Sequence, residues 1–547
     1  MVIVCLTHLF IFYHYVGAAG NQSLKVETQN GWVVGRKIAH SLYGWNGIPY
    51  AKPPLGDLRF EPPQVPDNWT GTWNATYDRS ECISFSISEV FESFINPSGD
   101  EDCLYINVYT PKPPQKIRTP LPVIVWFYGG GFVFGNSSYA LYGPNALVEK
   151  NVIFVSFNYR LSIFGFISTN DSAAPGNTGL KDQVHALKWV RNNILAFGGD
   201  PNRVTIMGQS AGSASVGYMV LTPLTKGLFS KAIMESGSTL CFWALSKTGP
   251  KAATLTGNIL GTANSSSEVL ISELKKVPAK KLLRAASLAM ISIMADNPLD
   301  GLVYTPVIEP ASKGAVITTS SFEILRSGNF NHIPVLVGYN SAETYALEKG
   351  LKLLWGYVIS YDLDPARLVP VSMRTNSSEL QTVGREIKSF YTGNSGVFTA
   401  GTFLNFLSDT AFVRPIQEDV NLTSQYVTTY FYRFSYNPTP GALGAAHADE
   451  LNYIFNSNYN STTDLFVKKC IVSLWTNFVK YGQPTVPKNK SVCGGVNWKA
   501  ITPTARQELY FVDINKKVTA GINPDKGNMT FWSNLFEEYA NLPLYTY

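Results

Sequence analysis

Residues 204–216, VTIMGQSAGSASV, have the composition expected around a catalytic serine. An apolar, β-branched run ends in Gly208-Gln209-Ser210-Ala211-Gly212, and a segment of helical character follows. A strand, a glycine-flanked serine and a helix form the context of a nucleophile elbow, in which a Cβ on either flanking residue would collide with neighbouring backbone. Ser210 is therefore the candidate nucleophile, and the N-terminus of the helix would stabilise its alkoxide and a developing oxyanion.

A second glycine cluster is suited to bind an oxyanion. Residues 121–128, LPVIVWFY, are typical of a buried parallel strand, and Gly129-Gly130-Gly131-Phe132 follows at once. Glycines let the backbone approach a ligand closely and turn its N–H groups towards a tetrahedral intermediate. The alternative is a flexible loop, but such a loop rarely follows a buried strand so directly and ends in bulky residues.

A nucleophilic serine needs a general base, and the base needs a group that orients it. His447 lies in a small-residue loop after a predicted strand at 429–434, where α/β sheets place their chemistry. His185 is expected within a helix, and His332 precedes a strand at the end opposite the catalytic edge. His447 is the predicted base among six histidines: His8, His14, His40, His185, His332 and His447.

The acid that orients the base is expected between the two, after another strand. The predicted strand 335–339 leads into Asn340-Ser341-Ala342-Glu343, which makes Glu343 the candidate. The order serine, acid, histidine is that of α/β-hydrolases. A surface glutamate that begins a helix is the alternative interpretation, and Asp362, Asp364 and Asp409 are rivals without a preceding strand.

Strands and helices alternate along the first half of the chain, which predicts an α/β fold with a doubly wound sheet. Residues 248–299 are helical and less regular, so we expect an insertion over the sheet that shapes a substrate pocket. An acyl-pocket wall is expected near residues 300–304. The other segments expected are strands at 31–38, 152–160, 231–238 and 508–513, and helices at 179–190, 351–410, 464–481 and 529–540.

Composition excludes several classes of protein. The chain has 547 residues, of which 45% are hydrophobic and 15% charged, so disorder is excluded. Its net charge of +5 comes without a basic block, which argues against a nucleic-acid partner. Neither Cys-x-x-Cys nor His-x-x-x-His occurs, so we expect no metal and no cofactor. Because large α/β enzymes often form one unit, we expect a single domain over residues 20–547.

The N-terminus is predicted to be a signal peptide, residues 1–19. A short apolar run ends in Gly17-Ala18-Ala19, the pattern of a signal-peptidase site, and is too short for an uncleaved anchor. No GPI-type tail is recognised, so we expect a secreted protein without a membrane anchor. Glycosylation sequons agree with secretion and begin at Asn21, Asn68, Asn74, Asn136, Asn170, Asn264, Asn376, Asn421, Asn460, Asn489 and Asn528.

Removal of the signal would leave five cysteines, and an odd number predicts at least one free thiol or an intermolecular bridge. Cys82 and Cys103 bracket a polar loop that a bridge would close. Cys470 and Cys493 are a possible second pair, and Cys241 has no near neighbour in the sequence. The acids at 101–102 could pair with Arg59, for which an exposed ion pair of little energy is the alternative.

Taken together, these stretches resemble the type-B carboxylesterase/cholinesterase family over nearly the whole chain after the signal. The resemblance implies an α/β-hydrolase fold, Ser210 as nucleophile, Glu343 as acid and His447 as base. It implies an oxyanion hole of backbone N–H groups, a Cys82–Cys103 bridge, and Ser236 as a partner of Glu343. The motifs that carry the resemblance are Glu101–Val108, Tyr128–Phe132, Asp182-Gln183, Gly208–Gly212 and Gly444–His447. The resemblance assigns the donors of the oxyanion hole to the backbone N–H groups of Gly130, Gly131 and Ala211.

Departures from the family narrow the function. The acid stands in Ala342-Glu343-Thr344 where relatives often have Asp-Glu-Gly, no tryptophan occurs within residues 83–102, and Gln209 replaces the glutamate of cholinesterases. A choline ester is therefore a poor substrate candidate. The chain is similar to secreted insect esterases, so we expect hydrolysis of a small-molecule carboxylic ester, with a juvenile-hormone or odorant esterase as one alternative. A non-catalytic adhesion protein is the other, although such proteins typically lose triad residues and carry a membrane stalk.

Overall fold

The computed structural model describes residues 24–84, 97–262, 266–455, 459, 461–486, 492–503 and 508–547, without the side chains of 349–354 and 492. The predicted signal peptide lies outside these residues, as do the sequons at Asn21, Asn264, Asn460 and Asn489. Within the described ranges, no helix has the length and apolar character needed to cross a membrane.

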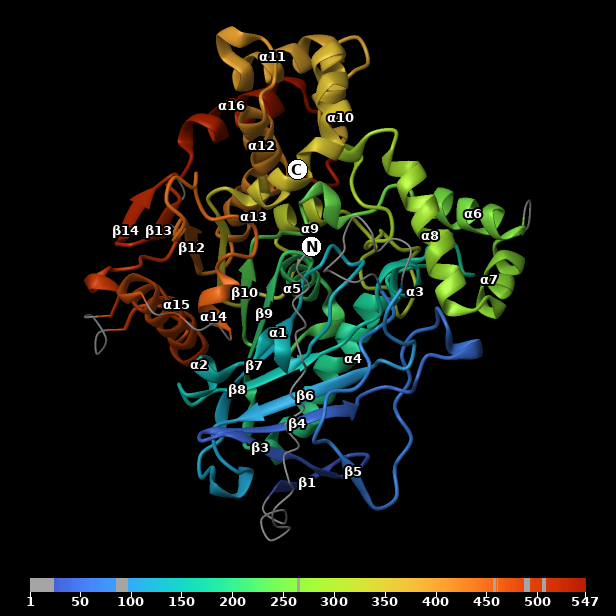
Figure 1. The fold of residues 1–547 in the computed structure, drawn as a ribbon, viewed down its shortest axis with the longest axis vertical. Coiled ribbons are helices and arrows are strands. Elements are labelled where there is room, and N and C mark those ends of the chain that lie inside the picture. The colour runs from blue at the N-terminus through green and yellow to red at the C-terminus, as the bar shows by residue number, and fades with distance from the viewer. Residues whose placement is uncertain are drawn as a thin grey trace, which may run out of the picture.

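An eleven-stranded mixed sheet runs through the molecule (Figure 1). Its seven middle strands, β8 to β13 in spatial order, pair in parallel, and the outer pairs are antiparallel. The spatial order is β14 (Val518–Ile522), β13 (Tyr510–Ile514), β12 (Thr429–Phe434), β11 (Val335–Asn340), β10 (Lys231–Glu235), β9 (Gly199–Gln209), β7 (Leu121–Phe127), β8 (Ile153–Phe157), β6 (Tyr105–Thr110), β4 (Leu42–Pro49) and β3 (Arg36–Ala39).

The middle strands are buried because helices cover the sheet. All five residues of β8 are buried, as are six of the seven in β7, which explains their continuous apolar sequence. The helix α5 (Ala211–Leu221) packs on β7, β9 and β10, and α15 (Thr462–Tyr481) contacts β7 and β9. Other helices are α1 (Tyr139–Tyr142), α2 (Asn145–Val148), α3 (Ser162–Phe166), α4 (Thr178–Asn193), α9 (Ser321–Ser327), α13 (Arg414–Thr423) and α14 (Leu451–Ile454).

Two groups of helices stand apart from the sheet in Figure 1. The predicted insertion at 248–299 forms α6 (Gly249–Leu260), α7 (Ser267–Lys276) and α8 (Ala279–Met294). The second group joins distant segments, since the rings of Phe390 and Phe531 stack 4.0 Å apart. It contains α10 (Leu351–Leu363), α11 (Leu380–Thr392), α12 (Ala400–Ser408) and α16 (Lys526–Tyr539).

Two predicted strands differ from the structure. Residues 31–38 do not form one strand: β2 (Gly31–Val34) joins β1 (Lys25–Thr28) and β5 (Thr72–Asn74) in a small sheet, whereas β3 belongs to the large one. Gly35 divides them, and a Cβ there would lie 2.5 Å from the carbonyl oxygen of Gly44. The strand predicted as the last is followed by β14, whose residues show no apolar alternation because all five are half-buried or exposed.

Two disulfides connect described cysteines. Cys82 is bonded to Cys103, as the resemblance implied, and Cys470 is bonded to Cys493. Cys241 is the free thiol that the odd count predicted, and its side chain is fully buried.

Arg59 and Glu101 form a buried rather than an exposed ion pair. Two hydrogen bonds of 2.7 and 2.6 Å join the guanidinium to the carboxylate, and their side chains are 9% and 11% exposed. Arg59 Nη1 also donates to the carbonyl oxygens of Leu274, Lys275 and Val277 at the C-terminal end of α7. A cation is favourable there because the last carbonyls of a helix lack partners, so the pair ties the disulfide loop to the helical insertion.

Candidate active site

Ser210 occupies a strained turn between β9 and α5. Its φ and ψ are 59° and −125°, outside the regions that residues with a Cβ favour. A Cβ on Gly208 would lie 2.4 Å from the oxygen of Gly212, and one on Gly212 would lie 2.0 Å from the oxygen of Phe127. The Ser210 N–H donates a 2.8 Å hydrogen bond to the Glu235 carbonyl. The predicted elbow is therefore present, and both glycines are required by contact.

The glycine turn after β7 lies against the elbow. A Cβ on Gly129 would lie 2.9 Å from the Ser210 Cβ. Gly130 and Gly131 have φ values of 117° and 60°, which side chains disfavour. Among the described residues, none accepts a hydrogen bond from the N–H groups of Gly130, Gly131 or Ala211. The three predicted donors are thus unused by the fold next to the serine.

His447 and Glu343 form the second half of the site. His447 Nδ1 lies 2.6 Å from Glu343 Oε2, and the His447 backbone N–H donates to the Glu343 carbonyl at 3.0 Å. Glu343 is fully buried three residues after the end of β11, and its Oε1 accepts a 2.7 Å hydrogen bond from the Asn340 N–H. Burial lowers the pKa of His447, but the charge and hydrogen bond of Glu343 outweigh it and the pKa is raised overall.

The other ring nitrogen of His447 faces the elbow. His447 Nε2 lies 3.3 Å from Gln209 Nε2, and Gln209 precedes the serine directly. With Nδ1–H directed to Glu343, Nε2 is the acceptor and the Gln209 amide is the donor. No hydrogen bond joins Ser210 Oγ and the imidazole in the described structure. Contacts of this kind are often long without substrate, so the arrangement suits a base that shifts from the amide to the serine.

The rival residues lie elsewhere. His40 contacts Ser41 at the surface, His185 lies on α4 beside Tyr50, and His332 contacts the Gly328 carbonyl. The three aspartates have other partners, which are Lys388 for Asp362, Gln381 for Asp364, and Tyr391 with Asn528 for Asp409.

Ser236 does not make the contact with Glu343 that the resemblance implied. Its hydroxyl is buried and has no hydrogen-bond partner in the structure. Glu343 Oε1 is already bonded to the Asn340 N–H, so the turn after β11 provides the support expected from Ser236.

Two apolar side chains at the site were not predicted individually. The Phe412 ring centre lies 4.7 Å from that of His447, on a π-helical segment, Asp409–Val413. A Cβ on Gly131 would lie 3.2 Å from Leu302 Cδ1, so Leu302 borders the glycine turn, within the wall expected at 300–304. π-Helical turns are frequent at functional sites, but the apolar spacing around Phe412 cannot be distinguished from that of core residues.

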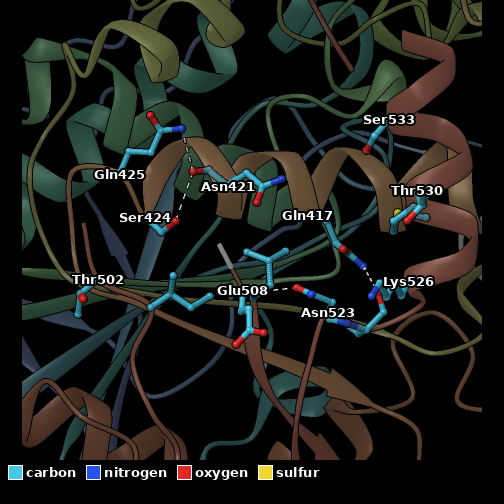
Figure 2. Close-up of a pocket in the computed structure, with 14 residues that line it drawn as sticks. Gln417, Asn421, Ser424, Gln425, Thr502, Glu508, Asn523, Lys526, Thr530 and Ser533 are labelled. Atoms are coloured by element: carbon cyan, nitrogen blue, oxygen red, sulfur yellow. Dashed lines mark hydrogen bonds between the residues drawn. The ribbon is translucent and has the colours of Figure 1, made fainter. Parts of the chain in front are cut away.

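A polar pocket of about 540 Å³ lies away from these residues (Figure 2). It is bordered by α13, by α16 and by segments that include residues 501–502, 508–509 and 523–524. Amides and hydroxyls dominate its lining, with Glu508 and Lys526 as its charged groups. None of the predicted catalytic residues lines it. Within the described ranges, no group of three or more potential ligands is placed to hold a metal ion.

The geometry of the site and the mixed sheet define the class of protein. Residues 22–532 match the model of the carboxylesterase family. The chain is 33% identical to esterase FE4 of Myzus persicae, covering 94% of this chain and 93% of the relative, and 34% identical to juvenile hormone esterase of Tribolium castaneum, covering 92% and 90%.

Solved structures show the same architecture. Juvenile hormone esterase of Manduca sexta, with OTFP covalently attached, matches with a TM-score of 0.81 and 26% identity over 94% of this chain and 99% of that one. A PNB esterase matches with a TM-score of 0.75 and 29% identity over 93% and 100%. The fold is that of the α/β-hydrolases. The protein belongs to the carboxylesterase family, and the relatives named above are esterases.

Proposed function

We propose that the protein is a secreted serine esterase that cleaves carboxylic esters through an acyl-enzyme. The observation that carries the proposal is the line from Glu343 through His447 to the elbow, with distances of 2.6 Å at one ring nitrogen and 3.3 Å at the other. An imidazole that is oriented by a buried carboxylate and faces the turn carrying a strained serine suits a general base and its nucleophile.

Each step has a residue suited to it. His447 removes the Ser210 proton as Oγ attacks the ester carbonyl, and the oxyanion accepts hydrogen bonds from Gly130, Gly131 and Ala211. His447 then protonates the departing alcohol. Water, deprotonated by the same imidazole, attacks the acyl-enzyme and releases the acid. Glu343 stabilises the imidazolium in both halves.

Replacing the nucleophile tests the assignment. We expect Ser210→Ala to lose turnover of p-nitrophenyl acetate and labelling by a fluorophosphonate probe, with an unchanged melting temperature. Activity that survives in the variant would overturn the mechanism. Absence of both turnover and labelling in the unmodified protein would instead favour the non-catalytic alternative.

A dedicated hormone esterase is the second candidate, because two relatives carry the name juvenile hormone esterase. Phe412 and Leu302 give the site apolar walls that suit a long apolar substrate. The ratio of kcat/KM for a terpenoid methyl ester to that for p-nitrophenyl acetate distinguishes the candidates. A ratio far above one would favour the dedicated enzyme, and a ratio below one a general esterase.

Secretion is part of the proposal and rests on residues 1–19 and the sequons. The name of one relative, venom carboxylesterase-6 of Apis mellifera at 30% identity, agrees with secretion. When the full chain is expressed in insect cells, the protein should appear in the medium without residues 1–19, and N-terminal sequencing should begin near residue 20. An intact N-terminus within the cells would contradict secretion.

A further inference from the structure

The polar pocket of about 540 Å³ is not used by the proposed mechanism, and a glycosylation sequon begins in its wall. Asn421 is the first residue of Asn421-Leu422-Thr423 and lines the pocket from α13. Figure 2 shows it between Gln425 and Gln417, which also line the pocket, because residues four positions apart share one face of a helix. Asn421 is exposed and therefore lies in the middle of this wall.

The polar groups of the pocket are only partly used by the fold. The amide nitrogen of Gln417 donates to the Pro524 carbonyl at 3.1 Å, and that of Gln425 donates to the Asn421 carbonyl at 3.2 Å. Their amide oxygens accept no hydrogen bond from the described residues. The same is true of further side chains in the lining, which have no partner within the described ranges: Glu508, Lys526, Thr530 and Ser533. The pocket therefore offers both donors and acceptors to an occupant.

This lining suits a carbohydrate. Sugar hydroxyl and acetamido groups both donate and accept hydrogen bonds, which matches a wall of amides and hydroxyls. Leu509 and Met529 lie among these groups and can pack against the C–H faces of a pyranose ring. The volume falls within the range of roughly 300–1,000 Å³ in which proteins hold small molecules.

We propose that Asn421 carries an N-linked glycan and that the pocket holds its N-acetylglucosamine core. Asn421 Nδ2 displaces the lipid diphosphate from the anomeric carbon of an oligosaccharide donor, and one amide proton leaves with that phosphate. The first ring then lies beside Nδ2, at the pocket wall. The amide keeps one N–H, which can maintain the 3.3 Å hydrogen bond to Glu418 Oε2.

The inference rests on the proposed secretion, since sequons are modified in chains that enter the secretory pathway. It does not depend on the esterase mechanism, because none of the predicted catalytic residues lines the pocket.

Asn376 is the matched comparison within the chain. It begins another sequon, is exposed like Asn421, and its Nδ2 also donates to an acid three residues away, Glu379, at 3.0 Å. It lies before α11 and does not line the pocket. Glycans at the two positions therefore differ in their surroundings and not in the local contact of the amide that carries them.

Enzymatic release from the native protein tests the proposal. The chain secreted from insect cells is treated with peptide:N-glycosidase, and release at each sequon is followed by mass spectrometry. Release from Asn421 should be at least roughly tenfold slower than from Asn376, because the enzyme acts only when the sugars leave the pocket. After denaturation the two rates should agree. Equal rates in the native protein would overturn the proposal.

A substitution on α16 tests whether the pocket itself supplies the protection. Ser533 is exposed and lines the pocket, so the ring of Ser533→Trp should displace the sugars, and release from Asn421 should approach the rate at Asn376. Asn534→Trp is the matched control, since this neighbour is exposed on the same helix but does not line the pocket, and it should retain slow release.

Lys526→Ala removes an exposed donor without adding volume and should shift release in the same direction as Ser533→Trp. Unchanged melting temperatures show that the variants fold. Protection that persists in both pocket variants would overturn the pocket as the binding site.

The outcomes also separate this proposal from the proposed secretion. A secreted chain with a glycan on Asn376 and none on Asn421 would overturn the glycan site alone. A chain that stays within the cells, without a glycan at any sequon, would overturn secretion and this proposal together. The esterase mechanism would stand in either case, because its test is the loss of turnover in Ser210→Ala.

Discussion

Two buried clusters of charge lie within this molecule and are neutralised differently. Near α4, Arg160 donates to both oxygens of Asp182 at 2.8 and 2.6 Å, and Lys181 pairs with Glu309 at 2.6 Å. At the site, three acids, Glu343, Glu450 and Asp449, act on one imidazole, and no lysine or arginine is among their described ion pairs. The first cluster matches each anion with a cation, whereas the second carries an excess of acid.

The difference indicates that the charges near α4 stabilise the fold, whereas the charges at the site adjust the basicity of the imidazole. A matched buried pair resists titration, and breaking it leaves an uncompensated charge that destabilises the fold. An unmatched group of acids raises pKa values towards neutrality and makes an imidazole more basic. Variants in the first cluster should therefore affect stability, and variants in the second should affect rate and its pH dependence.

The largest effect is expected for Glu343→Gln. The neutral amide no longer stabilises the imidazolium or selects its tautomer, so kcat should fall by roughly 10⁴. The melting temperature should change little, because the amide retains an oxygen for the Asn340 N–H. A loss of kcat below about tenfold would place the orienting acid elsewhere.

Asp182→Asn should give the opposite result. It leaves Arg160 buried with 4% exposure and without its anion, so the free energy of unfolding should fall by about 3–5 kcal/mol. Denaturant titration measures this loss, and kcat per folded molecule should stay unchanged. If the variant kept its stability but lost activity, the division between the two clusters would be wrong.

The pH dependence of kcat/KM should show the raised pKa of His447. The base is inactive when protonated, so activity should fall as pH decreases through this pKa, with a midpoint above the ordinary value of about 6.5. Asp182→Asn should show the same midpoint because its charge belongs to the other cluster. A midpoint below 6.5 would mean that burial outweighs Glu343.

The smallest effect is expected for Phe412→Ala. The ring packs 4.7 Å from the imidazole, and such contacts contribute roughly 0.5–1.5 kcal/mol, so kcat/KM should fall about threefold to tenfold. Phe390→Ala is the control, since that ring stacks on Phe531 in the outer helices and should alter stability alone. Equal effects on activity would indicate a general loss of packing.

The sequence predicted the parts of the site that local chemistry determines. Gly208 and Gly212 are needed wherever a serine takes this turn, and Glu343 and His447 follow strands whose apolar runs are clear. Three features could not be predicted because they depend on side-chain orientation and on a π-helical turn. They are the contact of Gln209 with His447, the Ser236 hydroxyl without a hydrogen-bond partner, and the Phe412 ring beside the imidazole. The position of β14 also escaped prediction, since a partly exposed edge strand needs no apolar period.

Cys241 is the one free thiol among the described residues, and it can report local opening of the fold. Its sulfur is fully enclosed, and burial raises its pKa, so it is neither accessible nor ionised in the native molecule. A thiol reagent can reach it only when the interior separates, and the modification rate then measures how often this happens. Among the described residues, the modification rate of this one thiol therefore reports local opening without an engineered label and without a substrate.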